Sequence, residues 1–399
     1  MKIVAINDLK NGSPARIMDW ILDTAHSQIG AETYSFYGWW KDKEVSYYTY
    51  GKPKEVLLSG ICSRITGLHG IWNIWGTREL IKKLEQIEPD IIHLHNIHMW
   101  NTNVPMLFKY IKKNNVRVVW TLHDCWAFTG QCPYFSAVKC EKWKQGCGKC
   151  AQLGRYPKSV LDNTKTVFKL KKKWFKNVKQ MVLVTPSNWL LDLTKESFLN
   201  EYSALCINNG IDLEIFKPRV SRFREKYHIQ DKRIVLGVAF EWGFRKGLDV
   251  FVELSKVLDS GYVIVLVGYN GKIDCDNIIT INRTHDQVEL AEIYSTVDVF
   301  FNPTREDNFP TVNIEALACG TPVVTFNSGG SSEMIDNTCG VALETENIEE
   351  IKSSIIGTIE AKELTPVACR NRALKYSNKD KFREYVDIYE KLMEGRKDE

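Results

Sequence analysis

Short apolar runs rich in β-branched residues recur through both halves of this chain, and longer helical patterns separate them. Near-continuous apolar strands that alternate with helices are typical of parallel sheets covered on both faces. The predicted strands are residues 2–6, 90–95, 116–122 and 181–185 in the first half and 233–239, 262–267, 277–281, 298–302 and 322–326 in the second. Two such series predict an α/β chain with two Rossmann-like domains.

A turn-rich segment, residues 208–218, is the expected junction of the two domains. We predict a first domain over residues 1–205 and a second over residues 206–376, followed by a charged amphipathic helix within 377–399. Ligands of open parallel sheets bind at the carboxyl ends of the strands. Two such domains therefore predict an active site in a central cleft between them.

The charge of the chain is nearly balanced, with 53 Lys and Arg against 49 Asp and Glu and a net charge of +4. Such a small excess does not indicate a nucleic-acid-binding protein, and we expect no nucleic-acid partner. No apolar run approaches the ~20 residues that a membrane span needs, and the first residues are too short for a signal-peptide core. We expect a cytoplasmic protein.

Four of the eleven cysteines lie close together, at Cys132, Cys140, Cys147 and Cys150. Four clustered thiolates in a reducing compartment suit a tetrahedral structural zinc ion, and the Cys-x2-Cys half has the usual spacing. The alternatives are reduced thiols that pack as small apolar groups, or a redox role.

Residues 164–180 hold seven lysines and no acidic residue. Val167, Leu170, Trp174 and Val178 recur at helical spacing and predict an apolar stripe. Two interpretations are open. The helix binds an anionic membrane surface, which makes the protein peripheral on the inner face of the cytoplasmic membrane, or its stripe packs on the sheet while the lysines are solvated.

Polar residues follow several predicted strands. Gly12 lies between the first strand and a probable helix, where Ser13 can cap and the backbone can approach a phosphate. His123 ends another strand and is followed by Asp124. The histidines at 93, 95 and 98 suit either a metal or ordinary bonding to backbone groups at strand ends.

The second half carries the strongest motifs. Arg245 and Lys246 form a cationic turn after a strand, which suits a diphosphate. Asp307 lies in a later acidic loop, eight residues before Glu315 on a predicted helix. Backbone amides at the start of that helix, residues 308–311, are expected to face a ligand. A buried carboxylate at Glu315 needs polar partners, and vicinal hydroxyls fit that need.

The order of these motifs resembles the retaining GT-B glycosyltransferases of group 1, family 4. The resemblance rests on the Arg-Lys-Gly turn, on an acidic residue separated from a Glu by seven residues, and on the Ala-Leu-Ala-Cys-Gly-Thr-Pro-Val-Val run at 316–324. Segments in the first half are similar too: Gly-x-x-Ala-Arg at 12–16, His-Leu-His-Asn at 93–96, Thr-Leu-His-Asp at 121–124 and Thr-Pro-Ser-Asn-Trp at 185–189.

This resemblance implies a role for each matching residue. Asp307 would lie near the sugar of a nucleotide-sugar donor, and His123 would lie beside its reacting carbon. Donor-binding roles fall to Gly12, Arg245, Lys246, Asn308, Phe309, Pro310, Thr311 and Glu315, with Glu315 on the ribose. The helix after Ser377 would cross back onto the first domain. Catalysis would use no metal or other cofactor.

The implied reaction moves a sugar, with retention, to a lipid-linked or growing bacterial surface polysaccharide such as capsule, O-antigen or exopolysaccharide. A UDP-sugar is the favoured donor, and a GDP-sugar is the second choice. The chain departs from the pattern at Asp307, where the family usually has Glu, and at Ser13, where it has Gly. Two alternatives stay open: an inactive GT-B-like partner protein and a zinc-bearing nucleic-acid-binding protein.

Overall fold

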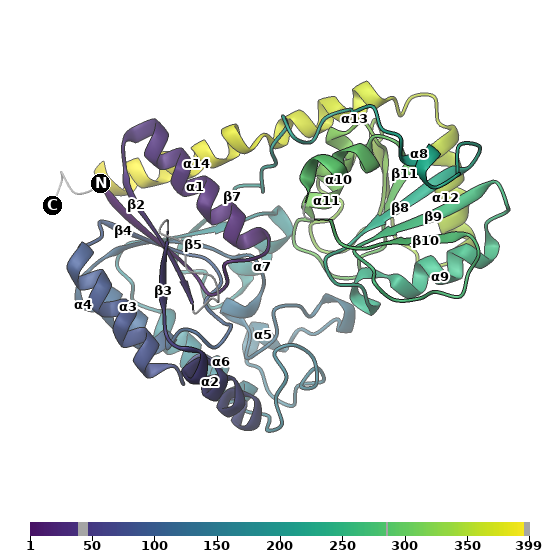
Figure 1. Cartoon of the computed structure of the whole chain (residues 1–399). Helices are drawn as coiled ribbons and strands as arrows, with labels where there is room; N and C mark the ends of the chain where they lie inside the picture. Colours follow the sequence, from purple (N-terminus) through teal and green to yellow (C-terminus); the bar gives the residue numbers. More distant parts are fainter. Residues whose placement is uncertain (39–46, 285, 395–399) are drawn as a thin grey trace. The chain divides into compact units, whose positions relative to one another are not determined.

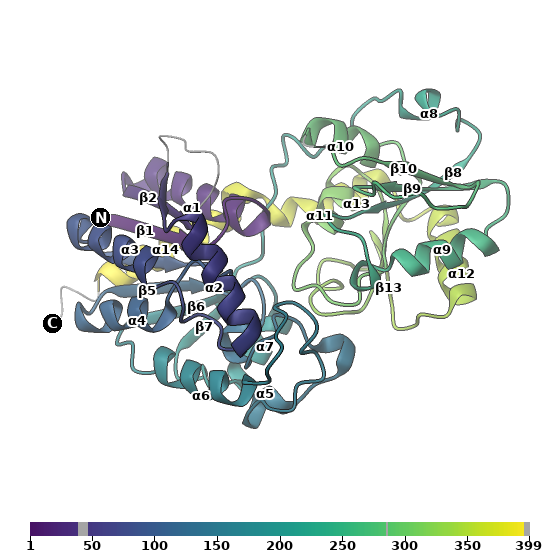
Figure 2. The same cartoon turned by 60° about the horizontal axis from the view of Figure 1, so that its bottom comes forward.

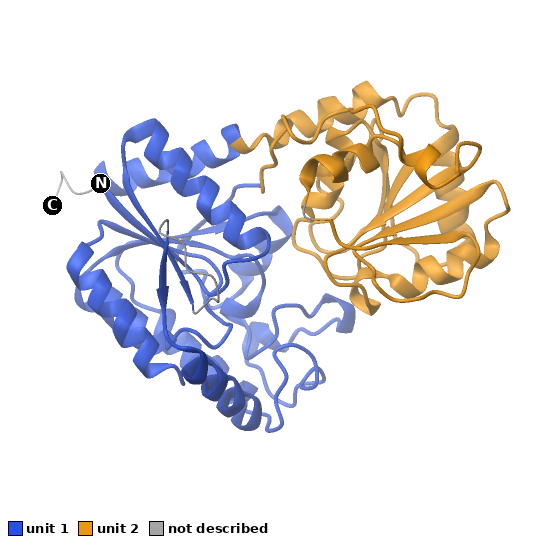
Figure 3. Cartoon of the chain, viewed as in Figure 1, with its two compact units in different colours: residues 1–208, 379–399 blue, residues 209–378 orange. Residues whose placement is uncertain are grey.

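The computed structural model describes residues 1–38, 47–284 and 286–394. The chain forms two compact units, which are shown in two colours in Figure 3. Unit 1 comprises residues 1–208 together with the C-terminal segment from Lys379, and unit 2 comprises residues 209–378. The boundaries expected from the sequence, after residues 205 and 376, lie close to these.

Unit 1 is built around a parallel sheet with the strand order β3-β2-β1-β4-β5-β6-β7 among the described residues. Its elements, which Figure 1 labels, are β1 (Lys2–Asn7), α1 (Ser13–Ile29), β2 (Glu32–Gly38), β3 (Tyr48–Tyr50), α2 (Pro53–Thr66), α3 (Ile74–Ile87), β4 (Ile91–Leu94), α4 (Val104–Lys113), β5 (Arg117–Thr121), η1 (Trp126–Phe128), η2 (Ser136–Val138), α5 (Lys142–Gln145), α6 (Thr164–Phe175), β6 (Met181–Thr185), α7 (Asn188–Glu196), β7 (Ser203–Cys206) and the greater part of α14 (Asn378–Glu394).

Alternate side chains of β1 enter two separate cores, because successive residues of a strand point to opposite faces. Val4 and Ile6 pack with residues of α3, α4 and α6, whereas Ile3 and Ala5 pack with residues of α1 and α14. The helix α14 belongs to the second core, where Trp20 of α1 stacks on Phe382 at a centroid distance of 5.8 Å. The predicted return of the C-terminal helix onto the first domain is confirmed.

Unit 2 repeats this plan with the order β10-β9-β8-β11-β12-β13, again parallel. Its elements are α8 (Phe223–Lys226), β8 (Arg233–Val238), η3 (Phe244–Lys246), α9 (Leu248–Val257), β9 (Tyr262–Val267), β10 (Ile278–Ile281), α10 (Gln287–Tyr294), β11 (Val299–Asn302), α11 (Thr311–Ala318), β12 (Val323–Phe326), β13 (Gly340–Leu343), α12 (Ile348–Glu360), α13 (Pro366–Ala373) and η4 (Leu374–Tyr376). Figure 2 shows α9 and α12 together on one side of this sheet and α10 on the other.

In each sheet the strand order reverses at one point, between β1 and β4 in unit 1 and between β8 and β11 in unit 2. Loops that leave neighbouring strands in opposite directions open a crevice at such a switch point, and ligands of these folds bind there. The motifs that follow these strands are therefore expected to lie at the ligand-binding crevice of their own unit.

Candidate active site

The cationic turn of unit 2 follows β8 and meets the acidic loop that follows β11. Lys246 Nζ lies 2.5 Å from Asp307 Oδ2, and both side chains are largely buried. The Arg245 guanidinium donates to the backbone oxygen of Glu306 at 3.0 Å. β8 and β11 are the strands that flank the switch point, so the structure brings Arg245, Lys246 and Asp307 together where a ligand is expected.

Arg305 fastens these two loops, and sequence reasoning missed it. Its guanidinium donates to both oxygens of Asp249 at 2.9 Å, to Glu346 at 2.8 Å and to the Phe244 carbonyl at 2.6 Å. Although burial opposes a charge there, the hydrogen bonds from the guanidinium to Asp249 and Glu346 raise the pKa of Arg305. Asp249 and Glu346 stand 56 and 41 residues away in sequence, so no local motif pointed to the arrangement.

The acidic loop leads directly into α11. The Gly330 N–H donates to the Asp307 carbonyl at 3.1 Å, and a Cβ atom at Gly329 would lie only 1.9 Å from that carbonyl oxygen. Asn308 and Phe309 are buried, and Pro310 precedes the first helical residue, Thr311. Pro310 occupies the N-cap position and makes no side-chain capping bond to the first amides of α11.

Glu315 lies on α11 and is only 5% exposed. The Tyr294 hydroxyl is 3.4 Å from Glu315 Oε2, and burial together with this carboxylate raises the pKa of Tyr294 well above its usual value. The tyrosine therefore keeps its proton and holds the carboxylate in place. The expectation of a buried Glu315 with polar partners agrees with this geometry, while its role toward a ribose stays a prediction.

His123 of unit 1 stacks on His95, with ring centroids 5.2 Å apart and a hydrogen bond of 2.9 Å between His95 Nδ1 and His123 Nε2. Burial lowers the pKa of His123 to about 4 and that of His95 well below its usual value. Both rings are therefore neutral near neutral pH. His93 bonds to the hydroxyls of Tyr389 and Thr121 at 2.6 and 2.8 Å, so side chains and not backbone groups satisfy it.

Asp124 pairs with His98 at 2.9 Å and accepts from the Trp126 N–H at 2.8 Å. Although burial opposes ionisation, the neighbouring His98 and the hydrogen bonds to the carboxylate lower the pKa of Asp124. Residues 95–98 and 120–124 of these strand ends, with Trp126 and Ala127, line a small pocket. His123 thus lies at a pocket on the carboxyl ends of β4 and β5.

The loop after β1 contains Gly12, which caps α1 with φ 89°. The expectation that Ser13 caps this helix is wrong, because Ser13 is its first residue and Gly12, with a positive φ that suits glycine, occupies the N-cap position. Asp8, which belongs to none of the predicted motifs, anchors the loop. Its carboxylate accepts from Thr102 Oγ1 at 2.8 Å, from the Tyr50 hydroxyl at 3.2 Å and from the Met99 N–H.

The basic segment forms a shorter helix than expected, because α6 ends at Phe175. Its buried face is Thr164, Val167, Phe168, Lys171 and Phe175, so Leu170 and Trp174 of the predicted stripe are only partly buried. Lys171 points inward: its Nζ donates to the carbonyls of Trp126 and Thr129 at 2.6 and 3.0 Å and lies 3.4 Å from the Trp126 ring centroid. Burial lowers the pKa of Lys171 well below its usual range.

The four clustered cysteines lie in the segment that follows η1. Among the described residues, no three His, Cys, Asp or Glu side chains are placed so as to hold a metal ion. The four thiols are close enough to influence one another: burial, and then Cys150, Cys147 and Cys140, raise the pKa of Cys132 to about 12. The Gly130 N–H donates to Cys147 Sγ at 3.1 Å. Whether they bind zinc stays a prediction.

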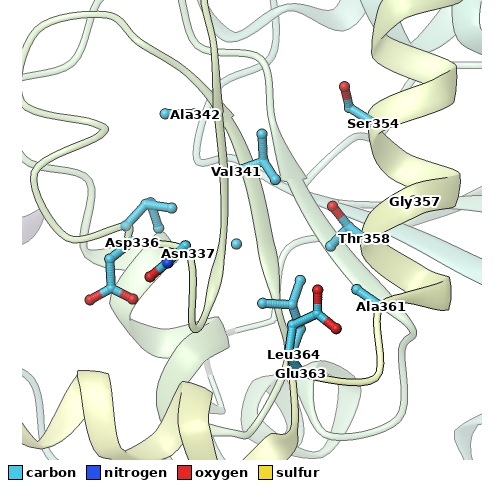
Figure 4. Close-up of a pocket in the computed structure, with 12 residues that line it drawn as sticks. Asp336, Asn337, Val341, Ala342, Ser354, Gly357, Thr358, Ala361, Glu363 and Leu364 are labelled. Atoms are coloured by element: carbon cyan, nitrogen blue, oxygen red, sulfur yellow. The ribbon is translucent and has the colours of Figure 1, made fainter.

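A further pocket of about 570 Å³ lies at the edge strand β13 of unit 2 (Figure 4). Asp336, Asn337, Ser354, Thr358 and Glu363 contribute polar groups to its lining. None of the site residues that the sequence predicted lines this pocket, and it lies away from the loops after β8 and β11.

Comparison with known proteins identifies the class. Residues 42–215 match the family model "Glycosyltransferase Family 4" and residues 220–376 match "Glycosyl transferases group 1". The structure resembles HepE from Anabaena, solved in complex with UDP-glucose, with a TM-score of 0.65 and 13% identity over 98% of this chain and 99% of that chain. Two Rossmann-like units with motifs at their switch points define a glycosyltransferase of the GT-B fold.

Two relatives narrow this class. The putative colanic acid biosynthesis glycosyl transferase WcaC of Escherichia coli K12 is 27% identical over 76% of this chain and 77% of its own length. An N,N'-diacetylbacillosaminyl-diphospho-undecaprenol alpha-1,3-N-acetylgalactosaminyltransferase of Campylobacter jejuni is 25% identical over 55% of this chain and 62% of its own length. The chain belongs to the group 1, family 4 glycosyltransferases. None of its described helices combines the length and apolarity that crossing a bilayer demands.

Proposed function

We propose that this glycosyltransferase moves a sugar from a nucleotide-sugar, with a UDP-sugar favoured over a GDP-sugar, to a lipid-linked or growing bacterial surface polysaccharide. The meeting of Lys246, Arg245 and Asp307 beside the start of α11 at the switch point of unit 2 carries the proposal. The relatives named for colanic acid and for an undecaprenol-linked substrate support the acceptor class.

The proposed transfer breaks the bond between the sugar and the diphosphate and forms a bond from the same sugar carbon to an acceptor oxygen. The departing diphosphate oxygen takes up the negative charge of the broken bond and accepts the proton that the acceptor hydroxyl gives up. Arg245, Lys246 and the first amides of α11 stabilise that charge without a metal or other cofactor. The acceptor enters on the face that the diphosphate leaves, which retains the configuration.

Calorimetry with UDP, GDP and ADP tests the donor site. We expect micromolar binding of one nucleotide and a loss of about 100-fold in Glu315→Gln, since a neutral amide bonds ribose hydroxyls more weakly than a carboxylate does. Glu350→Gln, at an exposed position on α12, is the matched control and keeps wild-type affinity. Equal affinity in Glu315→Gln removes the ribose role, and no binding by the wild type favours an inactive partner protein.

We also propose that Cys132, Cys140, Cys147 and Cys150 bind one structural zinc ion. The four thiols lie close enough to influence one another's pKa, and this proximity supports the proposal together with the usual Cys-x2-Cys spacing of Cys147 and Cys150. Because the thiols are not already placed around a metal, they must converge on binding it.

Elemental analysis of the purified chain tests the zinc site. We expect about one zinc ion per chain, with loss of that zinc in Cys147→Ser/Cys150→Ser. Cys275→Ser in unit 2 is the control and keeps the metal. A zinc-free wild-type chain with four titratable thiols at this cluster contradicts the proposal and leaves the cysteines as packing groups.

A further inference from the structure

The helix α2 exposes its large apolar side chains and buries small polar ones. Its exposed aliphatic side chains are Leu57 (66% exposed), Leu58 (53%), Ile61 (47%) and Ile65 (53%). The residues that the helix buries are Ser59 and Ser63. A helix that only covers a core places its large apolar side chains inward and its polar ones outward. The arrangement in α2 is the reverse.

The inner side of α2 has no room for large side chains. A Cβ atom at Gly60 would lie 3.3 Å from the indole of Trp100, so that ring fills the space beneath the helix. Small residues on this side let the helix lie close to the unit, and its aliphatic residues are left to face outward. Figure 1 shows α2 at the margin of unit 1.

The outward side chains form one face. At about 100° per residue, the four aliphatic side chains fall within an arc of about 120°, together with Lys54 and Arg64 near the two ends of the helix. A neighbouring segment extends this face: Val160 N–H donates to the Arg64 carbonyl at 2.7 Å and Leu161 N–H to the Ile65 carbonyl at 3.3 Å. Val160 and Leu161 are 67% and 53% exposed. We call these six aliphatic residues the α2 face.

Basic side chains surround the α2 face. The exposed basic residues are Lys52, Lys54, Arg64 and Lys158. The acidic residues there are the exposed Asp162 and the partly buried Glu55. An apolar helical face with basic residues at its rim fits the boundary between lipid headgroups and acyl chains, where aliphatic groups are buried and cations meet anionic headgroups. This charge complementarity identifies an anionic lipid surface as the occupant.

We propose that the α2 face docks the chain on an anionic lipid bilayer by inserting its aliphatic side chains below the headgroups. The inference rests on the proposed function in one respect: the lipid-linked acceptor is anchored in the same bilayer. Residues 156–161 connect the face with the candidate site: the Tyr156 hydroxyl lies 3.2 Å from His98 Nδ1, and His98 pairs with Asp124. Docking therefore brings the bilayer surface beside the pocket that holds His123.

Sedimentation with vesicles tests the inference on the full chain. We expect binding to vesicles of phosphatidylcholine with phosphatidylglycerol and weaker binding to phosphatidylcholine alone. Ile61→Ser/Ile65→Ser should lower the affinity by about tenfold or more, since two aliphatic side chains lose their apolar burial. Lys54→Glu/Arg64→Glu should lower it as well and weaken its dependence on salt.

Two variants serve as matched controls. Val220→Ser/Val367→Ser removes aliphatic groups that are 98% and 68% exposed in unit 2, and we expect unchanged vesicle binding. Lys172→Glu/Lys173→Glu alters exposed lysines of α6, the surface that the sequence suggested for lipid, and should have a smaller effect than the α2 variants.

The inference is overturned if the wild type binds no anionic vesicles, or if the Ile61/Ile65 variant binds as well as the wild type. A loss confined to the α6 variant instead assigns lipid binding to α6. UDP calorimetry on the same samples separates this result from the donor proposal. Nucleotide binding without vesicle binding contradicts only the docking, and vesicle binding without nucleotide binding contradicts only the donor site.

Discussion

Replacing His123 with asparagine is expected to slow sugar transfer by about 100-fold or more while leaving UDP affinity unchanged. The residues proposed to hold the nucleotide through its ribose and diphosphate in unit 2 are Lys246, Arg245 and Glu315, and His123 belongs to unit 1. A residue that positions the reacting sugar affects the rate, whereas nucleotide binding does not depend on it. The measurement is UDP release from a UDP-sugar, with a membrane extract as acceptor.

The physical basis of this expectation is the neutral imidazole. With its pKa lowered to about 4, His123 carries one N–H and one lone pair near neutral pH, and it shares one hydrogen bond with His95. Asparagine retains a hydrogen-bond donor and an acceptor, so it can still bond His95, but its shorter side chain does not extend as far toward the sugar. A rate within about twofold of the wild type, with an unchanged unfolding curve, would show that His123 does not act on the sugar.

Acid is expected to destabilise unit 1 strongly between about pH 6.5 and pH 4. Burial lowers the pKa of His93 to about 3 and that of His69 to about 4. The folded pKa lies below the unfolded value near 6.5, so the unfolded chain binds more protons in this window and stability falls as the pH falls. The stabilisation is fully present above about pH 6.5, and His93 alone accounts for a loss of about 2.5 kcal/mol by about pH 4.5.

Urea unfolding at about pH 7.5, 6 and 4.5 tests this expectation. His93→Gln removes the titrating ring but leaves a side chain able to bond Tyr389 and Thr121, so the variant should lose less stability on acidification than the wild type does. His228→Asn, at an exposed position in unit 2, is the control and should keep the full acid sensitivity. The assignment fails if His93→Gln and the wild type lose stability equally over the same range.

The central strands of both sheets could be predicted from the sequence, whereas several outer strands could not. β6 and β9 match the predicted runs at both ends, because strands buried on two faces are continuously apolar. β2 reads Glu-Thr-Tyr-Ser-Phe-Tyr-Gly and is only partly buried over its first half. The edge strands β3, β7 and β13 contain three or four residues and carry too little apolar sequence to be separated from loops.

Some residues of the candidate site could likewise be predicted from the sequence, and others could not. Lys246 and Asp307 could be found because each follows a recognisable strand, and parallel strands bring their carboxyl ends to one edge. Arg305 and Asp8 could not, because their partners come from distant segments that only the folded chain brings together. The burial of Lys171 could not be predicted for another reason. A lysine normally lies on the solvated face of a helix, and here the Trp126 and Thr129 carbonyls, at η1 and just after it, accept from the buried amine.

The return of α14 has a consequence for biosynthesis. Tyr389 supplies the hydroxyl that bonds His93, 296 residues earlier, and Leu392 accepts from Arg117. A ribosome makes residues 1–208 before unit 2, yet the core shared by α1 and α14 stays open until α14 has been synthesised. Unit 1 is thus begun before unit 2 and completed after it, and the nascent chain must keep an apolar sheet face uncovered while the whole of unit 2 is translated.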